Sequence, residues 1–371
     1  MRKYYSGITV FKLVGSLTVL LAHIKLPSAY LALTYRVAGL AQMMAVVVPC
    51  FYMVSGFLAY QGWTRAASPG TYIRRYLLWI SAVYALFCGY YLATTTLPAL
   101  IGNYQAHVAL GGPVRLLFDV FFLQGPAYSL WFVPPLLAGI GTTYFFERRG
   151  WFRAVCLLAL AGFGFAQLTY GPLRVLAERL GQPVPWCTGR HALLVAKLSA
   201  NYLGIGFPAV VAGAWVARHE TVFLGMRARW LALGAAGLLV AETWFLWWAT
   251  GGHYSYTLVF SMAPISLLLF LGVLRLEAPG IRAYHTLINR FSMVVFFAHV
   301  LLIRANYLVL NCPALGLAPG QELACVVLTL LESVALTLLL THYLARRSQR
   351  AAPAPALALA NYEPATQPGL R

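Results

Sequence analysis

Long apolar segments alternate with short polar connections over most of this chain. Each segment has about 20 residues, the length that an α-helix needs to cross the hydrocarbon core of a bilayer. We expect ten such segments, at residues 7–24, 38–60, 76–97, 128–146, 154–170, 197–217, 230–249, 255–274, 290–309 and 322–344. The pattern therefore predicts an all-α fold, a polytopic transmembrane helical bundle of about ten spans.

Basic residues gather in alternate connections between these segments. The basic set is Arg2 and Lys3; Arg65, Arg74 and Arg75; Arg148, Arg149 and Arg153; Arg218, Arg227 and Arg229; Arg275, Arg282 and Arg290; Arg346, Arg347 and Arg350. Connections on the cytoplasmic side of membrane proteins carry an excess of Lys and Arg, so both termini are predicted to be cytoplasmic. The basic start "MRKYYSG" is typical of a secretory signal, but no small-residue cleavage site follows, and an uncleaved first helix is expected.

The chain is expected to form one membrane domain and a short tail. Residues 1–346 hold all the apolar segments and show no internal repeat. Residues 347–371 are rich in Pro and Ala and lack an amphipathic period, which predicts a disordered cytoplasmic tail.

Composition narrows the class of protein. Hydrophobic residues make up 61% of the chain and charged residues 10%, whereas soluble domains have about 25% charged residues. The formal net charge of +18 is spread over short clusters rather than a basic stripe interleaved with aromatic residues. Membrane lipids are therefore the expected surroundings, and nucleic acid is not an expected partner.

The cysteines indicate no metal site. None of the six lies in a CxxC pair or at a Cys/His ligand spacing, so no metal is expected. Cys187 and Cys312 both fall in connections predicted to face outward, where a disulfide is chemically permitted. The sequence does not place them within bonding distance, and the pairing stays open.

Two ionisable residues in the first apolar segment are the first candidates for chemistry. Lys12 and His23 are 11 positions apart. At a rise of 1.5 Å and a turn of 100° per residue they lie about 16 Å apart along the helix, on nearly the same face. Burying a lysine in a span costs about 2.5–3.5 kcal/mol, which favours a polar cavity. In the alternative, Lys12 reaches the cytoplasmic headgroups and His23 simply lies in the interface.

Five short motifs, in order along the chain, resemble those of the acyltransferase 3 family of integral-membrane O-acyltransferases. They are the Lys12-x10-His23 spacing, "VPCFYMVSGFLAY" from Val48, "TYIRRYLLWI" with its arginine pair, "SLWFVPPLLAG" from Ser129 and "RFSMVVFFAHVLLI" from Arg290. Many members have an acidic residue three positions before the basic residue, where this chain has Thr9.

The resemblance implies transfer of an acyl group, most often acetyl, from acyl-CoA to a hydroxyl of a cell-surface glycan or lipid-linked saccharide. It also implies a multi-pass protein of the bacterial inner membrane. His23 suits the role of general base or acyl carrier, because its unperturbed pKa is near 6.5. Lys12 is too far from His23 for a shared contact, so we expect it to bind the polar arm of the donor or to pair with another polar group inside the bundle.

Other residues take their expected roles from the same resemblance. Arg74 and Arg75 match the donor-binding position, where guanidinium groups suit the diphosphate of coenzyme A, although topology alone also explains them. Ser55 and Trp131 are candidates for substrate contact, with helix packing and interfacial anchoring as their alternatives.

The last candidates are His299, Asp119 and three glutamates. His299 lies within a span, where an ionisable side chain is a functional candidate, although a hydrogen bond to a neighbouring helix also explains it. Asp119 is the chain's one aspartate and could orient His23. Its competitors are Glu178, Glu242 and Glu322. A transporter or flippase for a glycan intermediate is the alternative function, but paired halves typical of transporters are missing from the sequence.

Overall fold

The computed structural model describes residues 4–24, 46–97, 101, 118, 121–122, 130–182, 192–251, 258–311 and 319–351. Within these ranges the chain is helical and contains no strand. The α-helices are α1 (Ser6–His23), α4 (Val47–Arg65), α5 (Pro69–Tyr91), α8 (Val133–Arg148), α9 (Phe152–Tyr170), α10 (Pro172–Arg179), α11 (Ala192–Leu198), α12 (Phe207–Arg218), α13 (Glu220–Gly225), α14 (Ala228–Thr250), α15 (Met262–Arg275), α16 (His285–Val309) and α17 (Pro319–Ala351). The others are the π-helices η1 (Leu92–Thr96) and η5 (Ser199–Gly206) and the 3₁₀-helix η6 (Pro279–Tyr284).

Seven helical segments of the described chain are long and apolar enough to cross a membrane. They are Ser6–His23, Pro69–Thr94, Phe152–Tyr170, Leu194–Arg218, Ala228–Thr250, Pro279–Val309 and Gly320–Arg347. The helix α15 is apolar but shorter, and α4 and α8 occupy the other two expected segments. An all-helical membrane fold is therefore confirmed, whereas the count of about ten spans and the cytoplasmic termini stay predictions.

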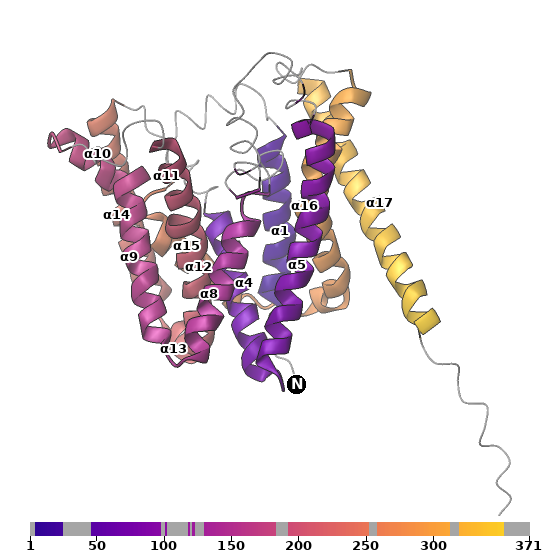
Figure 1. The fold of residues 1–371 in the computed structure, drawn as a ribbon, viewed down its shortest axis with the longest axis horizontal. Helices are drawn as coiled ribbons and strands as arrows, with labels where there is room; N and C mark the ends of the chain where they lie inside the picture. The colour runs from indigo at the N-terminus through magenta and orange to yellow at the C-terminus, as the bar shows by residue number, and fades with distance from the viewer. Residues whose placement is uncertain are drawn as a thin grey trace, which may run out of the picture.

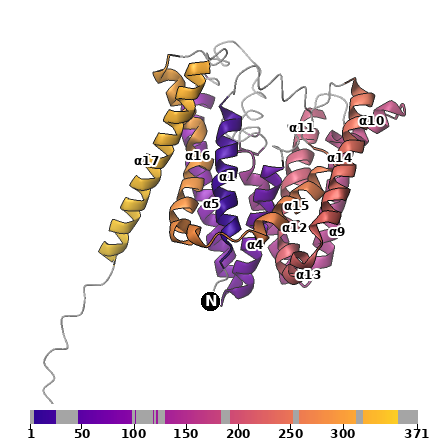
Figure 2. The same ribbon diagram turned by 180° about the vertical axis from the view of Figure 1, so that it is seen from behind.

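The long helices stand side by side, and the chain passes back and forth between the two ends of the bundle (Figure 1, Figure 2). The helices α4, α8, α12 and α15 all finish with an arginine, at Arg65, Arg148, Arg218 and Arg275. These four helices finish at the same end of the bundle as the N-terminus (Figure 1). One end of the fold therefore collects the basic residues on which the predicted orientation depends.

The C-terminal helix lies at the edge of the bundle. In both views α17 stands beside α16 and leans away from the other helices towards its own C-terminal end (Figure 1, Figure 2). It continues to Ala351, five residues into the expected tail. The rest of that tail lies outside the described residues, so its disorder stays a prediction.

The helices α4 and α12 meet through glycines. A Cβ atom on Gly56 of α4 would lie 2.2 Å from the Val210 carbonyl oxygen of α12. A Cβ on Gly213 of α12 would lie 2.0 Å from the Met53 carbonyl oxygen of α4. Small residues let membrane helices approach until their backbones touch, and Gly56 and Gly213 do so here.

Candidate active site

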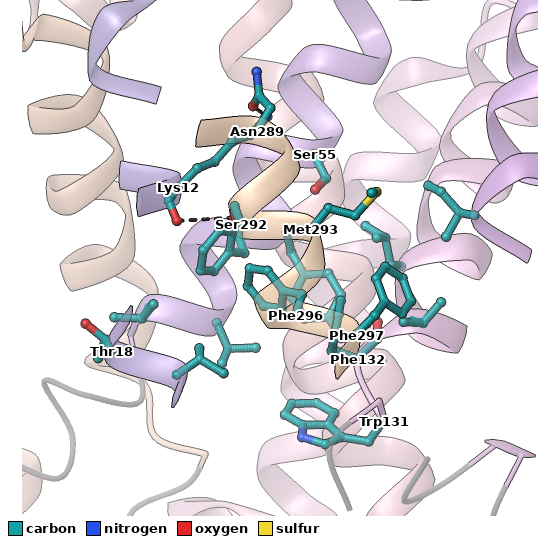
Figure 3. Close-up of a pocket in the computed structure, with 18 of the residues that line it drawn as sticks. Lys12, Thr18, Ser55, Trp131, Phe132, Asn289, Ser292, Met293, Phe296 and Phe297 are labelled. Atoms are coloured by element: carbon teal, nitrogen blue, oxygen red, sulfur yellow. Dashed lines mark hydrogen bonds between the residues drawn. The ribbon is translucent and has the colours of Figure 1, made fainter. Parts of the chain in front are cut away.

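A cavity of about 310 Å³ lies between α1, α4, α5, α16 and the turn before α8. Lys12, Asn289, Ser292 and Ser55 lie towards one end of it, and Trp131 lies at the other (Figure 3). Aromatic side chains fill the wall between these ends; they are Phe51, Phe132, Phe296 and Phe297. The cavity is therefore elongated, with polar groups at one end of an otherwise largely apolar wall.

Lys12 and His23 both line this cavity, so the two ionisable residues of α1 share one space. The helix runs unbroken from Ser6 to His23, and the 11 positions between them place the side chains about 16 Å apart along its axis. The face expected from the helical period is the face that the structure turns to the cavity.

The hydrogen bonding of His23 leaves one ring nitrogen with a lone pair. Its Nδ1 lies 2.8 Å from the Val19 carbonyl oxygen, one turn back on α1. A carbonyl only accepts, so Nδ1 carries the proton of the neutral ring and Nε2 keeps the lone pair. A histidine in this tautomer can accept a proton at Nε2.

His299 of α16 packs against His23. The two rings meet edge to face, with centroids 4.7 Å apart. The Nδ1 of His299 donates to the Val295 carbonyl at 2.6 Å, and its buried Nε2 has no hydrogen-bond partner among the described residues. The hydrogen bond of His299 is therefore made within its own helix rather than to a neighbouring helix, and its ring packs against the ring of His23.

Lys12 is held from the side of α16. Its ammonium group donates to Oδ1 of Asn289 at 2.8 Å, and Ser292 donates to its backbone carbonyl at 3.2 Å. The amide nitrogen of Asn289 lies 2.9 Å from Nε2 of His285, whose Nδ1 lies 2.9 Å from the Thr9 hydroxyl. The side chain therefore turns to a polar group inside the bundle, which is the cavity interpretation rather than the headgroup one.

The turn that carries Trp131 is fixed by α4. The hydroxyl of Tyr52 donates to the Phe132 carbonyl at 2.9 Å, just before α8 begins. Phe296 packs between Phe51 and Phe132, with ring centroids 4.5 and 5.3 Å away. These contacts bring the second and fourth expected segments to the same cavity as the first.

With this geometry in view, the chain was compared with known proteins. A family model for the acyltransferase 3 domain, described as an acyltransferase domain, matches residues 5–340. This chain belongs to the acyltransferase 3 family. No curated protein and no solved structure matches the chain. Its apolar helices and its family together make it a membrane acyltransferase.

In this acyltransferase, Arg74 and Arg75 lie outside the cavity. Both are exposed in the second turn of α5, before the cavity residues Tyr76, Trp79 and Ile80 of the same helix. At 100° per residue, Arg75 is about 100° from Tyr76 and Arg74 about 160° from it, in the opposite direction. Arg75 is therefore the nearer of the two to the cavity face of the helix.

The acid that could orient His23 is not found among the described side chains. Asp119 lies outside the described residues, as do Cys187 and Cys312, so the role of Asp119 stays a prediction and the cysteine pairing stays open. Glu178 pairs with Arg174 at 2.7 Å, and Glu242 accepts the backbone N–H groups of Phe260 and Ser261 at 2.6 and 2.8 Å. Glu322 is buried on α17.

Metal ligands do not gather within the described ranges, where no group of three or more His, Cys, Asp or Glu residues could hold an ion. No disulfide joins any two of the described cysteines Cys50, Cys88, Cys156 and Cys325, and all but Cys156 are buried.

Sequence reasoning found His299 but missed other residues of α16 that belong to the site. Asn289 and His285 lie before the motif that begins at Arg290, and Phe296 lies inside it without having been singled out. Asn289 lies three residues before Ser292 and Phe296 four residues after it, so both share a helix face with this residue of the quoted motif. That spacing was the signal in the sequence that could have found them.

Proposed function

We propose that this membrane acyltransferase transfers an acyl group, acetyl first of all, from cytoplasmic acyl-CoA to a hydroxyl. The acceptor is a cell-surface glycan or lipid-linked saccharide at the bacterial inner membrane. The observation that carries the proposal is that His23, whose Nε2 keeps a lone pair, lines the same cavity as Lys12.

The reaction needs a base because a sugar hydroxyl is a poor nucleophile at neutral pH. Nε2 of His23 takes the proton of the acceptor hydroxyl as the oxygen attacks the thioester carbonyl. The tetrahedral intermediate then expels the coenzyme A thiolate, which takes up the proton from His23. In the two-step form of the reaction, His23 first carries the acyl group itself.

The donor arrives from the basic end of the bundle. Arg74 and Arg75 bind its diphosphate, and Lys12 donates to oxygen atoms of its polar arm inside the cavity. The distance of about 16 Å between Lys12 and His23 suits one extended donor that reaches from the first to the second. Ser55 and Trp131 contact the substrates from the cavity wall.

His299 supports the histidine base. It holds the ring of His23 through their edge-to-face contact. The Val19 carbonyl already accepts the N–H of that ring, so Asp119 contacts the substrates from the outer connection instead.

The test measures free thiol released from acyl-CoA by the purified protein in detergent or nanodiscs, with and without candidate acceptors. Release that depends on the acceptor, and that is absent from a His23→Ala sample at equal protein concentration, supports the proposal. Export or flipping of a labelled glycan intermediate without thiol release would replace the acyltransferase function with the transporter function.

Labelling of single engineered cysteines from outside the cell checks the orientation, because a thiol near Arg148 should stay unmodified.

A further inference from the structure

The ammonium group of Lys12 is surrounded by polar neighbours that carry no negative charge. Its one hydrogen bond among the described residues goes to the neutral amide oxygen of Asn289, at 2.8 Å. Lys12 forms no salt bridge with a described carboxylate. An ammonium group has three N–H bonds, so two remain for a ligand in the cavity that Lys12 lines.

A chain of hydrogen bonds fixes the direction of the Asn289 amide. Lys12 only donates, so the Asn289 oxygen must face it and the amide nitrogen must face away. That nitrogen lies 2.9 Å from Nε2 of His285 and 3.2 Å from its Nδ1. When the neutral ring carries its proton on Nδ1, Nε2 accepts from the amide at the shorter distance and Nδ1 donates to the Thr9 hydroxyl at 2.9 Å. Tyr4 donates to the same hydroxyl at 3.2 Å. In this tautomer each link joins one donor to one acceptor.

The same links join α1 to α16. Thr9 and Lys12 come one turn apart on α1, and His285 and Asn289 come one turn apart on α16. The four side chains therefore alternate across the contact between the two helices. Many members of the family have an acidic residue one turn before the basic residue. This chain has Thr9 there, and its hydroxyl contacts His285 instead.

We propose that Asn289 and His285 are positioning residues that hold Lys12 in the cavity as a cation whose charge no side chain cancels. This inference rests on the proposed function, because the ligand is the acyl-CoA donor. Lys12 directs its two remaining N–H bonds at oxygen atoms of the donor's polar arm. A carboxylate in place of Asn289 holds Lys12 more strongly but cancels the charge that would attract the donor.

The variant Asn289→Asp distinguishes two roles for Asn289. In one it holds Lys12 and leaves the charge available to the donor; in the other it only anchors the lysine side chain. In Asn289→Asp the anchor is stronger, since a charge-assisted hydrogen bond replaces a neutral one. We expect the KM for acyl-CoA to rise about tenfold or more, the loss that follows when a hydrogen bond to a charged group is removed, while kcat changes less. If anchoring alone mattered, Asn289→Asp would leave KM unchanged or lower it, and the proposal would be overturned.

Two further variants test the chain of links. Asn289→Leu removes the anchor and should also raise KM. His285→Gln keeps an acceptor for the Asn289 amide and should retain most of the donor affinity, whereas His285→Phe should lose it. Equal KM values in His285→Gln and His285→Phe would overturn the positioning role of His285.

A matched control adds the same charge elsewhere on α16. Thr286 is exposed and does not line the cavity, so Thr286→Asp should leave KM near the wild-type value.

Binding of coenzyme A is measured alongside turnover, by the fluorescence of Trp79 and Trp131 in the cavity wall. Wild-type protein that neither binds coenzyme A nor releases thiol overturns the proposed function and this inference with it. Normal wild-type binding and turnover with an unchanged KM in Asn289→Asp overturns this inference alone.

Discussion

Two helix contacts in this molecule differ in what holds them together. The contact between α4 and α12 is a contact of backbones, since Gly56 and Gly213 leave no room for a Cβ atom against the opposite carbonyl oxygen. The contact between α1 and α16 is a contact of polar side chains, with Lys12 bonded to Asn289 and Thr9 bonded to His285. Close packing of small residues stabilises helix pairs in a membrane, whereas ionisable groups there are costly and mark function.

The helix α4 contacts α12 and also lines the cavity beside α1 and α16. Phe51, Tyr52 and Ser55 line the cavity that holds Lys12 and His23. Pro49 and Met53 line a second cavity of about 450 Å³, whose wall is almost entirely apolar and which carries no charged group among the described residues. The α4–α12 contact is thus held by packing, and the α1–α16 contact borders the cavity to which we assign the chemistry. The difference predicts which substitutions affect stability and which affect turnover.

The largest effect is expected at His23. Removing a general base lowers turnover about 10²–10⁴-fold, so His23→Ala should lose that much acyl transfer. Protein abundance should hardly change, because His23 ends α1 and is not fully buried. Rates of thiol release at matched protein concentration measure the effect. If His23→Ala released thiol at the wild-type rate, the α1–α16 contact would have no role in the chemistry.

The next effect is expected at Lys12. Lys12→Ala removes a hydrogen bond to a charged group, worth about 1.5–3 kcal/mol, and should remove most of the activity at low donor concentration. Lys12→Arg keeps the charge with a different geometry and should keep part of it. A lysine that merely reached for the headgroups would behave in the opposite way. Its replacement by alanine would be neutral or mildly stabilising, because a costly charge would be gone.

The packing contact is probed at Gly56. Gly56→Leu places a side chain where the Val210 carbonyl lies, and overpacking of this kind costs about 1–3 kcal/mol. The expected result is a lower melting temperature and lower abundance, with near-normal turnover per folded molecule. Gly89→Leu on α5 is the control, since a Cβ atom there meets nothing within 4 Å. Equal melting temperatures in the two variants would contradict the packing role of the α4–α12 contact.

The sequence predicts one side of the site better than the other, for a physical reason. Lys12 and His23 belong to one helix, whose period of 3.6 residues places them on one face without any knowledge of the fold. Their partners on α16 lie more than 270 positions away, and no periodicity within a segment reports which helices will touch. Asn289 and His285 were therefore found only once the helices were seen side by side.

Helix boundaries show the same limit. The segment 255–274 was expected to be a full span, but α15 begins only at Met262. The backbone N–H groups of Phe260 and Ser261, just before this helix, donate to the buried carboxylate of Glu242 on α14. A tertiary contact of this kind satisfies the open end of a helix, and hydropathy along the chain does not register it.

The smallest effect is expected at the arginine pair of α5, where the two residues serve as controls for each other. Both are exposed, so each contact with a donor phosphate should be worth no more than an exposed ion pair, about two- to fivefold in affinity. Arg75 lies nearer than Arg74 to the face that carries Tyr76, Trp79 and Ile80 into the cavity. We therefore expect Arg75→Ala to raise the KM for acyl-CoA more than Arg74→Ala does, with kcat nearly unchanged in both. The difference should shrink as salt rises, since salt screens exposed charges. Equal KM values with lower abundance in both variants would instead assign the pair to membrane topology, and donor binding would then depend on the cavity between α1 and α16 alone.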